Sequence, residues 1–296
     1  MSSIGFIGLG NMGAPMAANL VKAGRRVHGF DVAPASREAS ARDGVQIVAS
    51  ARSTVENADI VITMLPAGEH VLAVWDDIVP VARQGTLFID CSTIDVASAR
   101  KAHKLAAASG IATLDAPVSG GVGGAKAATL TFMVGGSAHA FTHGKPVLEQ
   151  MGKRIVHCGE AGNGQVAKIC NNMILGISMI GVSEAFVLGE RLGLSHQALF
   201  DVASASSGQC WSLTSYCPVP GPVPGSPANN HYRPGFAAAL MLKDLKLARA
   251  AAESVKAHTA LGAHAAKIYE EMAHAGRSGD DFSGIINLVR EQSKAD

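Results

Sequence analysis

Short apolar segments alternate with helical patterns through the first half of the chain. Segments rich in valine, isoleucine, leucine and phenylalanine predict strands at residues 3–8, 26–31, 59–65, 86–90, 111–115, 129–134 and 154–158. Helical spacing of apolar residues predicts helices at residues 12–23 and 97–108. Because strands that alternate with helices are joined by crossovers, we predict a parallel, doubly wound α/β sheet with right-handed crossovers.

The pattern changes near Gly159. Residues 159–164 read Gly-Glu-Ala-Gly-Asn-Gly, which predicts a turn-rich joint. A helical pattern then runs from Gln165 to about Leu192 and is apolar nearly all round, so we expect a long helix buried on most faces. The remainder is largely helical. We therefore predict two domains: an α/β domain at residues 1–162, and an all-helical domain at residues 163–296 that begins with the long helix.

A proline-rich segment interrupts the helical half. Half of the twelve prolines lie between residues 218 and 234. Such a segment can be a surface linker. However, it lies inside a helical domain and is flanked by Trp211, Tyr216 and Phe236, so we expect an ordered loop.

Composition and charge narrow the classes of function. Charged residues make up 17% of the chain, below the roughly 25% typical of soluble domains, which favours additional buried surface such as a subunit interface. The formal net charge is +1 and no basic or acidic block is present, so neither nucleic acid nor an anionic membrane is an expected partner. The uncharged run at residues 169–183 is too short to span a bilayer, which takes about 20 residues.

The cysteines and histidines do not form a recognisable framework. Five scattered cysteines without a CxxC pair argue against disulfides and favour a reducing compartment. His139 and His143 are four residues apart, but no third ligand lies nearby, so we predict no metal site. The first strand begins almost at once and no signal or transit segment precedes it, which predicts a cytoplasmic location.

A glycine motif follows the first predicted strand. Gly8, Gly10 and Gly13 form a GxGxxG between a strand and a helix, the arrangement that binds the pyrophosphate of a dinucleotide at a helix N-terminus. Asp31 ends the second strand, close to the expected place of a ribose-binding acid about 20 residues further on. A carboxylate there repels a 2′-phosphate and favours NAD, although the nearby Arg37 leaves NADP open. The alternative is a glycine-rich turn that binds nothing.

Three further motifs follow in order. They are Asp-Ala-Pro-Val-Ser-Gly-Gly at residues 115–121, Gly-Asn-Gly-Gln-Val-Ala-Lys-Ile-Cys-Asn-Asn at residues 162–172, and Lys-Asp-Leu at residues 243–245. Together with Phe-Ile-Gly-Leu-Gly-Asn-Met-Gly at residues 6–13, they resemble the β-hydroxyacid dehydrogenase family over essentially the whole chain. The resemblance implies a Rossmann-type NAD-binding domain at residues 1–162 and a substrate and oligomerisation domain at residues 163–296.

Lys168 and Asn172 are the catalytic candidates. Oxidation of an alcohol requires a base for the hydroxyl proton, and Lys168 lies near the start of an apolar helix, where burial and a cationic nicotinamide would disfavour the ammonium form. Asn172 is one turn further on the same face, whereas we expect Asn171 to point elsewhere. The resemblance implies the same roles for the pair. The alternative is a snorkelling lysine and a helix-packing amide.

The remaining site residues rest mainly on the resemblance. Ser119, Gly120 and Gly121 offer a hydroxyl and backbone N–H groups that suit a carboxylate, and the resemblance implies that they bind the substrate's acid group. Trp211 and Phe236 are candidate walls for a methyl-bearing substrate, and either can instead be core.

The resemblance also assigns residues to the cofactor. It places Lys243 at the cofactor with Asp244 near the substrate, although both can instead be charges on a solvated helix face. It brings further residues to the cofactor: Asn11 and Met12 in the glycine turn, and Leu65, Pro66, His70 and Thr93 after two of the strands, with His70 the weaker candidate.

Within the family, the chain most resembles members that oxidise 3-hydroxyisobutyrate to methylmalonate semialdehyde with NAD in valine breakdown. The expected partners are a short β-hydroxyacid and further copies of the chain, as a homodimer or homotetramer. Tartronate semialdehyde reduction and serine oxidation stay open, because one methyl group is worth only about 1–3 kcal/mol of discrimination. The alternative from another functional class is a non-enzyme: an NAD-binding module that keeps the fold but has lost catalysis.

Overall fold

A computed structural model describes residues 3–294 and divides the chain into two compact units, Met1–Lys168 and Ile169–Asp296. The predicted domain boundary after residue 162 lies at the start of the long helix, whereas the units divide after Lys168 within that helix. The roles predicted for the two domains stay predictions.

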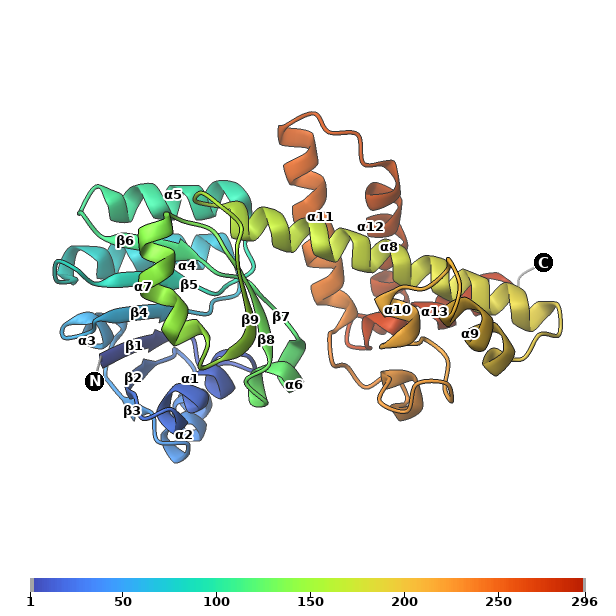
Figure 1. The fold of residues 1–296 in the computed structure, drawn as a ribbon, viewed down its shortest axis with the longest axis horizontal. Coiled ribbons are helices and arrows are strands. Elements are labelled where there is room, and N and C mark those ends of the chain that lie inside the picture. Colours follow the sequence, from blue (N-terminus) through green and yellow to red (C-terminus); the bar gives the residue numbers. More distant parts are fainter. Residues whose placement is uncertain (1–2, 295–296) are drawn as a thin grey trace. The chain divides into compact units, whose positions relative to one another are not determined.

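The first unit is built on a six-stranded parallel sheet (Figure 1). The strand order is β3 (Gln46–Ile47), β2 (Arg26–Phe30), β1 (Ser3–Ile7), β4 (Ile60–Thr63), β5 (Leu87–Asp90) and β6 (Ala112–Asp115). The central strands β4 and β5 are buried along their whole length, as expected when helices cover both faces of a parallel sheet. The fold therefore confirms the predicted doubly wound α/β architecture.

The helices of the first unit connect the strands in sequence. They are α1 (Gly13–Lys22), α2 (Pro34–Arg42), α3 (Ala51–Val55), α4 (Gly68–Ile78), the short 3₁₀ helix η1 (Val79–Val81) and α5 (Val96–Ala107). Two apolar clusters fill the interior, one containing Phe6, Leu20 and Ile89 and the other containing Trp75 and Phe88. Adjacent β1 residues Phe6 and Ile7 fall in different clusters, since successive side chains of a strand point to opposite faces.

The last two predicted strands do not join the parallel sheet. They form a second sheet of β7 (Val118–Ser119), β8 (Leu130–Val134) and β9 (Gly152–His157), in which β7 is antiparallel to β8. The outer edge of β6 is occupied instead by Gly135, which exchanges two backbone hydrogen bonds of 2.7 and 3.0 Å with Asp115. The expectation that these strands extend the main sheet is therefore wrong. Helices α6 (Gly121–Lys126) and α7 (Ala138–Leu148) belong to this region.

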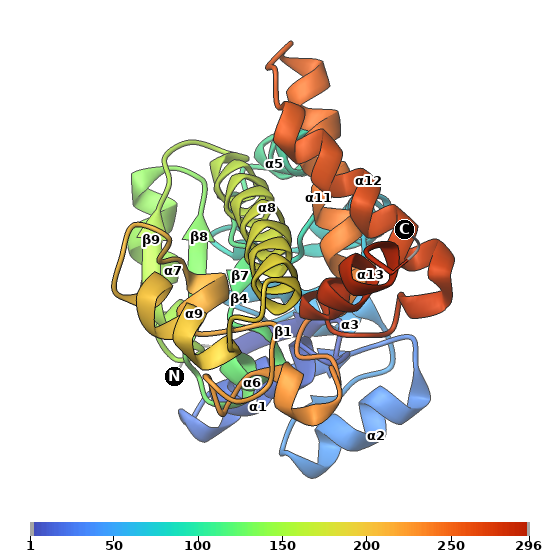
Figure 2. The same cartoon turned by 90° about the vertical axis from the view of Figure 1, so that its right-hand side faces the viewer.

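The second unit is helical within the described residues. It contains most of α8 (Asn163–Arg191), then α9 (His196–Ser204), α10 (Trp211–Thr214), η2 (Pro227–Asn230), α11 (Ala238–Ser254), α12 (Ala260–Met272), η3 (Ala273–Arg277), η4 (Phe282–Gly284) and α13 (Ile285–Gln292). Helices α11 and α12 lie side by side in Figures 1 and 2 and share a core with α8 through Met179, Met241 and Tyr269.

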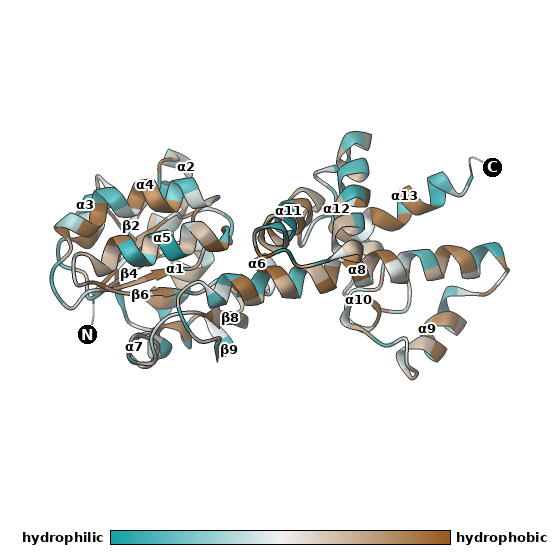
Figure 3. Cartoon of the chain, turned by 90° about the horizontal axis from the view of Figure 1, so that it is seen from above, coloured by the Kyte–Doolittle hydropathy of each residue, from teal (hydrophilic) through white to brown (hydrophobic). Residues whose placement is uncertain are grey.

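Helix α8 has the predicted extent but not the predicted burial. Side chains at helical spacing remain exposed along one stripe, and Ile174 and Leu188 keep 66% and 61% of their surface. Brown, apolar positions recur along this helix in Figure 3. By length and composition α8 could cross a membrane, but 44% of its most apolar window is buried inside the chain, and core helices of folded domains pass the same test.

The proline-rich segment is a packed loop. Cys217, Pro218 and Val219 are buried, and the Ser226 hydroxyl donates to the Cys217 carbonyl at 2.5 Å. The Tyr232 hydroxyl donates to the Pro218 carbonyl at 2.8 Å. These bonds fold the loop back on itself, as expected for an ordered loop rather than a linker.

Candidate active site

The glycine turn between β1 and α1 is shaped by close backbone contacts. A Cβ on Gly8, whose φ is +96°, would lie 2.2 Å from the Met64 carbonyl oxygen, and one on Gly13 would lie 1.9 Å from the Gly8 oxygen. A Cβ on Gly10 would meet nothing within 4 Å. Gly8 and Gly13 are therefore required by packing, whereas the open space at Gly10 fits the close approach of a pyrophosphate.

The predicted ribose acid is tied to this turn. The Asp31 carboxylate accepts hydrogen bonds from the Leu9 N–H at 2.7 Å and from the Ala33 N–H at 2.8 Å. The Arg37 guanidinium donates to the Asp31 carbonyl at 3.1 Å and lies 5.9 Å from the centre of the Phe30 ring. The structure thus brings the glycine motif and Asp31 together. Asn11 is exposed and Met12 half-buried where the turn enters α1.

Two loops at the carboxyl ends of β4 and β5 carry the residues assigned to the nicotinamide. Leu65 and Pro66 follow β4, and Thr93 lies in the loop after β5. The Leu65 N–H donates to the Ser92 hydroxyl at 2.8 Å, which joins the two loops. His70 is exposed in the first turn of α4.

A buried carboxyl group lies beneath these loops. Oδ1 of Asp90 accepts hydrogen bonds from the Thr63 hydroxyl at 2.8 Å and the Ser92 hydroxyl at 2.6 Å. Its Oδ2 has no hydrogen-bond partner among the described residues. Burial raises the pKa of Asp90 to about 6, more than these hydrogen bonds lower it.

Lys168 and Asn172 are both buried on α8. Lys168 keeps 6% of its surface. The Asn172 amide donates to the Asp244 carboxylate at 2.5 Å, so the structure brings two predicted site residues together. Asn171 lies on a different, exposed face of α8 as expected, and its side-chain amide donates to the Asn172 oxygen at 3.0 Å. Lys243 precedes Asp244 on α11 and is half-buried.

The loop predicted to bind a carboxylate begins at the end of β7. Ser119 is its last strand residue, and Gly120 and Gly121 have φ values of +132° and +60° where the chain enters α6. Residues with side chains rarely adopt such values, which explains the paired glycines. The backbone turns sharply here, as in the concave loops whose N–H groups bind anions.

Trp211 and Phe236 belong to one aromatic cluster in the second unit. The Trp211 ring stacks on Tyr216 at 4.8 Å between centroids, Tyr216 stacks on Phe282 at 5.3 Å, and Phe236 meets Phe282 edge-on at 5.8 Å. Trp211 nevertheless keeps 51% of its surface. Phe236 therefore contributes to the core, whereas Trp211 presents an apolar face that the unit itself leaves uncovered.

Several polar residues around the first turn of α8 were missed by the sequence reasoning. Gln165 and Ser92 are fully buried, and Asp115 and His103 form a buried pair. The available signal was a glutamine inside an apolar helix and polar residues directly after apolar strands. Its meaning depends on which segments meet, and spacing alone does not reveal that.

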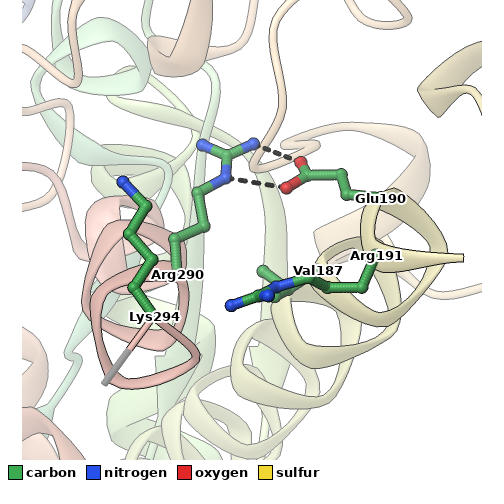
Figure 4. A pocket seen from close by; sticks show the side chains of 5 residues that line it. All are labelled: Val187, Glu190, Arg191, Arg290 and Lys294. Atoms are coloured by element: carbon green, nitrogen blue, oxygen red, sulfur yellow. Dashed lines mark hydrogen bonds and ion pairs between the residues drawn. The ribbon is translucent and has the colours of Figure 1, made fainter. Parts of the chain in front are cut away.

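A separate cavity of about 360 Å³ lies in the second unit and contains none of the predicted site residues (Figure 4). It is lined by Val187, Glu190, Arg191, Arg290 and Lys294. Arg290 binds Glu190 through two hydrogen bonds, one of them 3.1 Å from Nε. Arg191 and Arg290 lie in the last turns of α8 and α13, where a cation is favoured by the helix dipole.

The described residues contain neither a cluster of metal ligands nor a disulfide bond. Within residues 3–294, no group of three or more histidine, cysteine, aspartate or glutamate side chains could hold a metal ion. All five cysteines are free thiols.

Two family models cover the two halves of the chain. The NAD binding domain of 6-phosphogluconate dehydrogenase matches residues 3–159. A model described as NAD-binding of NADP-dependent 3-hydroxyisobutyrate dehydrogenase matches residues 162–289.

Curated relatives match over the full length. The chain is 54% identical to a probable 3-hydroxyisobutyrate dehydrogenase of Mycobacterium tuberculosis, with all of both chains covered. It is 50% identical to 3-hydroxyisobutyrate dehydrogenase of Pseudomonas aeruginosa, covering 98% of this chain and 99% of that one. It is also 45% identical to an NAD-dependent L-serine dehydrogenase of the same organism, covering 97% and 98%.

A solved structure supports the same relationship. The Mycobacterium tuberculosis 3-hydroxyisobutyrate dehydrogenase, described with L-serine, superposes with a TM-score of 0.95 at 54% identity and covers 98% of this chain and 99% of that one. The glycine turn, the buried lysine and these full-length similarities lead to one conclusion. The chain belongs to the 3-hydroxyisobutyrate dehydrogenase family of NAD-binding oxidoreductases, which act on β-hydroxyacids.

Proposed function

We propose that this enzyme oxidises 3-hydroxyisobutyrate to methylmalonate semialdehyde with NAD, as a step of valine catabolism. The observation that carries the proposal is the 50–54% identity over the full length to relatives named for this activity. A buried lysine near the start of α8 supports it, because alcohol oxidation needs a group that accepts the hydroxyl proton.

The residues of the first unit fit NAD. Gly8, Gly10 and Gly13 would hold the pyrophosphate, and Asp31 would accept hydrogen bonds from the ribose hydroxyls. The proposed cofactor residues of this unit also include Asn11, Met12, Leu65, Pro66, His70 and Thr93. Lys243 of the second unit stays a cofactor candidate from the family resemblance. One family model is named for an NADP-dependent enzyme, but the Asp31 carboxylate would repel a 2′-phosphate and therefore favours NAD.

NAD, when bound, supplies the acceptor for the hydride that leaves the carbinol carbon. The Lys168 amine takes the hydroxyl proton, so that the alcohol becomes an aldehyde with the loss of one hydride and one proton. Asn172, oriented by Asp244, holds the substrate beside Lys168. Ser119, Gly120 and Gly121 bind the substrate carboxylate.

The preference among β-hydroxyacids depends on the group at the second carbon. Trp211 and Phe236 favour a methyl group, since aromatic surface gains from apolar contact. L-Serine is the second candidate substrate, because a relative at 45% identity is named a serine dehydrogenase and the solved relative is described with L-serine. Tartronate semialdehyde reduction would use the same catalytic groups.

The exposed apolar stripe of α8 supports a homo-oligomer, dimer or tetramer. Ile174 and Leu188 on α8, and Leu192 directly after it, are exposed on the isolated chain, and large apolar patches on soluble proteins usually mark interfaces. Light scattering coupled to size-exclusion chromatography measures the assembly directly. A monomer at micromolar concentration would contradict this part of the proposal.

The test of the function is initial-rate NADH formation with purified enzyme. (S)-3-Hydroxyisobutyrate, L-serine, D-glycerate and 3-hydroxypropionate are compared, each with NAD and with NADP. We expect kcat/KM at least about tenfold higher for 3-hydroxyisobutyrate with NAD, roughly the discrimination that one methyl group allows. A preference for L-serine or D-glycerate would move the assignment to that rival, and no turnover of any of them would favour a binding module.

Asp31→Asn tests the cofactor assignment in the same assay. The variant keeps one of the two oxygens that accept backbone N–H groups but loses the charge, so the ratio of kcat/KM with NAD to that with NADP should fall. An unchanged ratio would remove Asp31 from the ribose site.

A further inference from the structure

The first turn of α8 is held by a carboxylate from a distant strand. Asp115, the last residue of β6, accepts the Gly162 N–H at 2.8 Å on Oδ1 and the Gln165 N–H at 3.0 Å on Oδ2. Helix N-termini leave N–H groups without intrahelical partners, and these are usually satisfied by a neighbouring Ser, Thr, Asp or Asn. Here the cap lies 47 and 50 residues away, so it fixes where the helix starts relative to the sheet.

Asp115 is itself fixed on its other side. His103 Nε2 lies 2.9 Å from its Oδ1, and the Thr113 hydroxyl lies 2.5 Å from His103 Nδ1. All three side chains are buried. The carboxylate therefore has little freedom to follow the helix if α8 shifts.

Gln165 ties the same turn to the loop after β5. Its Nε2 donates to the Ser92 carbonyl at 2.7 Å, and its Oε1 accepts the Ile94 N–H at 3.1 Å. One side-chain amide thus pairs with the backbone on both sides of Thr93. Gln165 is fully buried, so water does not compete for these bonds.

The linkage extends to the loop after β4. The Ser92 hydroxyl, which donates to Asp90, accepts the Leu65 N–H at 2.8 Å. Both loops proposed to border the nicotinamide are therefore joined through Ser92 and Gln165 to a turn that lies three residues before Lys168.

We propose that Gln165 and Asp115 are positioning residues that hold Lys168 in register with the loops containing Leu65 and Thr93. The inference rests on the proposed function, in which Lys168 accepts the proton and those loops border the cofactor. Neither residue needs to touch the substrate. They act by preventing α8 from sliding or rotating at its start, because a displacement of about 1 Å at a reacting group can lower a rate by about 100-fold.

The test is a pre-steady-state measurement of NADH formation with NAD and hydroxyacid in excess over enzyme. The rate constant of the first turnover reports the hydride and proton transfer, whereas the amplitude of that turnover, relative to the enzyme concentration, reports the fraction of enzyme that is folded and active. Gln165→Met removes both amide hydrogen bonds and keeps the approximate volume. Asp115→Asn keeps one acceptor oxygen and serves as a second, milder variant.

Asn163→Ala is the matched control. Its side chain belongs to the same turn and donates to the Cys158 carbonyl at 3.1 Å, outside the linkage to Ser92 and Ile94. Lys168→Ala, measured in parallel, tests the proposed function itself. NAD affinity from fluorescence titration and thermal unfolding complete the set.

We expect the rate constant to fall at least 20-fold in Gln165→Met and about 5-fold or more in Asp115→Asn, with full amplitude and NAD affinity changed less than about threefold. Asn163→Ala should stay within about twofold of the wild-type rate constant. A reduced amplitude with an unchanged rate constant in both variants would mean a merely structural role and would overturn the inference. If Lys168→Ala stays within tenfold of wild type, the proposed function fails instead.

Discussion

The two ends of helix α8 reverse the usual relation between polarity and burial. In its first two turns Gln165 is fully buried and Lys168 nearly so, whereas the apolar Ile174 and Leu188 further along are mostly exposed. Buried polar groups in folded proteins have partners, and Gln165 finds them in Ser92 and Ile94. The exposed side chains of Ile174 and Leu188, in contrast, are not covered by other residues of their own unit.

This difference separates two kinds of constraint on one helix. The first turns are held by hydrogen bonds to Asp115 at the end of β6 and to the loop after β5. Such bonds require a donor or an acceptor at a defined position, so they restrict which side chains can replace these residues. The later turns are held on one face by apolar packing in the core around Met179 and Met241, which tolerates similar volumes. Function is therefore expected at the start of α8, and assembly with other copies along its later turns.

The largest expected effect is on catalysis at the buried end. Lys168→Ala removes the proposed proton acceptor, and loss of a general base lowers rates by about 10²–10⁴-fold. Steady-state kcat and NAD affinity are measured, with the exposed Lys267→Ala as the control. We expect NAD affinity to stay within a few-fold, and residual activity within tenfold of wild type would refute the acid–base assignment.

Two glycine-to-alanine substitutions on α8, one at its start and one further along, should change the free energy of unfolding in opposite directions. A Cβ on Gly164 would lie 2.3 Å from the Met133 carbonyl oxygen and 2.6 Å from that of Asp115, so Gly164→Ala should cost about 3 kcal/mol or more. A Cβ on Gly181 meets nothing within 4 Å, and alanine there should stabilise the helix by about 0.5–1 kcal/mol. Urea unfolding measures both, and equal effects would contradict the comparison.

The buried carboxyl group of Asp90 should make the free energy of unfolding depend on pH. Burial raises its pKa from 3.8 to about 6, so between these values the folded state binds more protons than the unfolded state. Stability from this group is therefore highest at low pH and falls by up to about 3 kcal/mol as pH rises through 6. Asp90→Asn does not titrate, so the unfolding free energy of the variant minus that of wild type should increase between pH 4.5 and 8. A constant difference would disprove the burial argument.

The smallest expected effect lies at the far end of α8. Hydrogen bonds from Arg290 lower the pKa of Glu190, so this pair stabilises the fold above the ordinary range of a glutamate and loses that contribution as pH falls. Both side chains keep about a quarter of their surface. Glu190→Gln should therefore cost about 1 kcal/mol at pH 7, and this cost should shrink as pH falls below the ordinary titration range of a glutamate, as measured by urea unfolding. No cost at pH 7 would mean that solvent screens the pair fully.

Much of the first unit could be predicted because its signals are local. Apolar runs marked the strands, and the glycine spacing marked the turn in which Gly8 and Gly13 meet backbone. The prediction of one parallel sheet failed at β8 and β9, which pair with each other and with β7 in a separate sheet, since strand patterns do not specify the partner strand. Helical spacing correctly placed Asn171 on another face than the buried Asn172, but it did not reveal the hydrogen bond between the two side-chain amides.

The sequence by itself determined most strands of the first unit, the long helix, the glycine turn, and the positions of Asp31 and Lys168, because each follows from local periodicity or a short motif. The tertiary structure alone decided that Asp115 caps a helix 47 residues later, that Gln165 brackets Thr93, and which face of α8 stays exposed. Such relations depend on which strand ends lie next to one another. That proximity arises only when the chain has folded, since hydrogen bonds and burial depend on distance in space and not on separation along the chain.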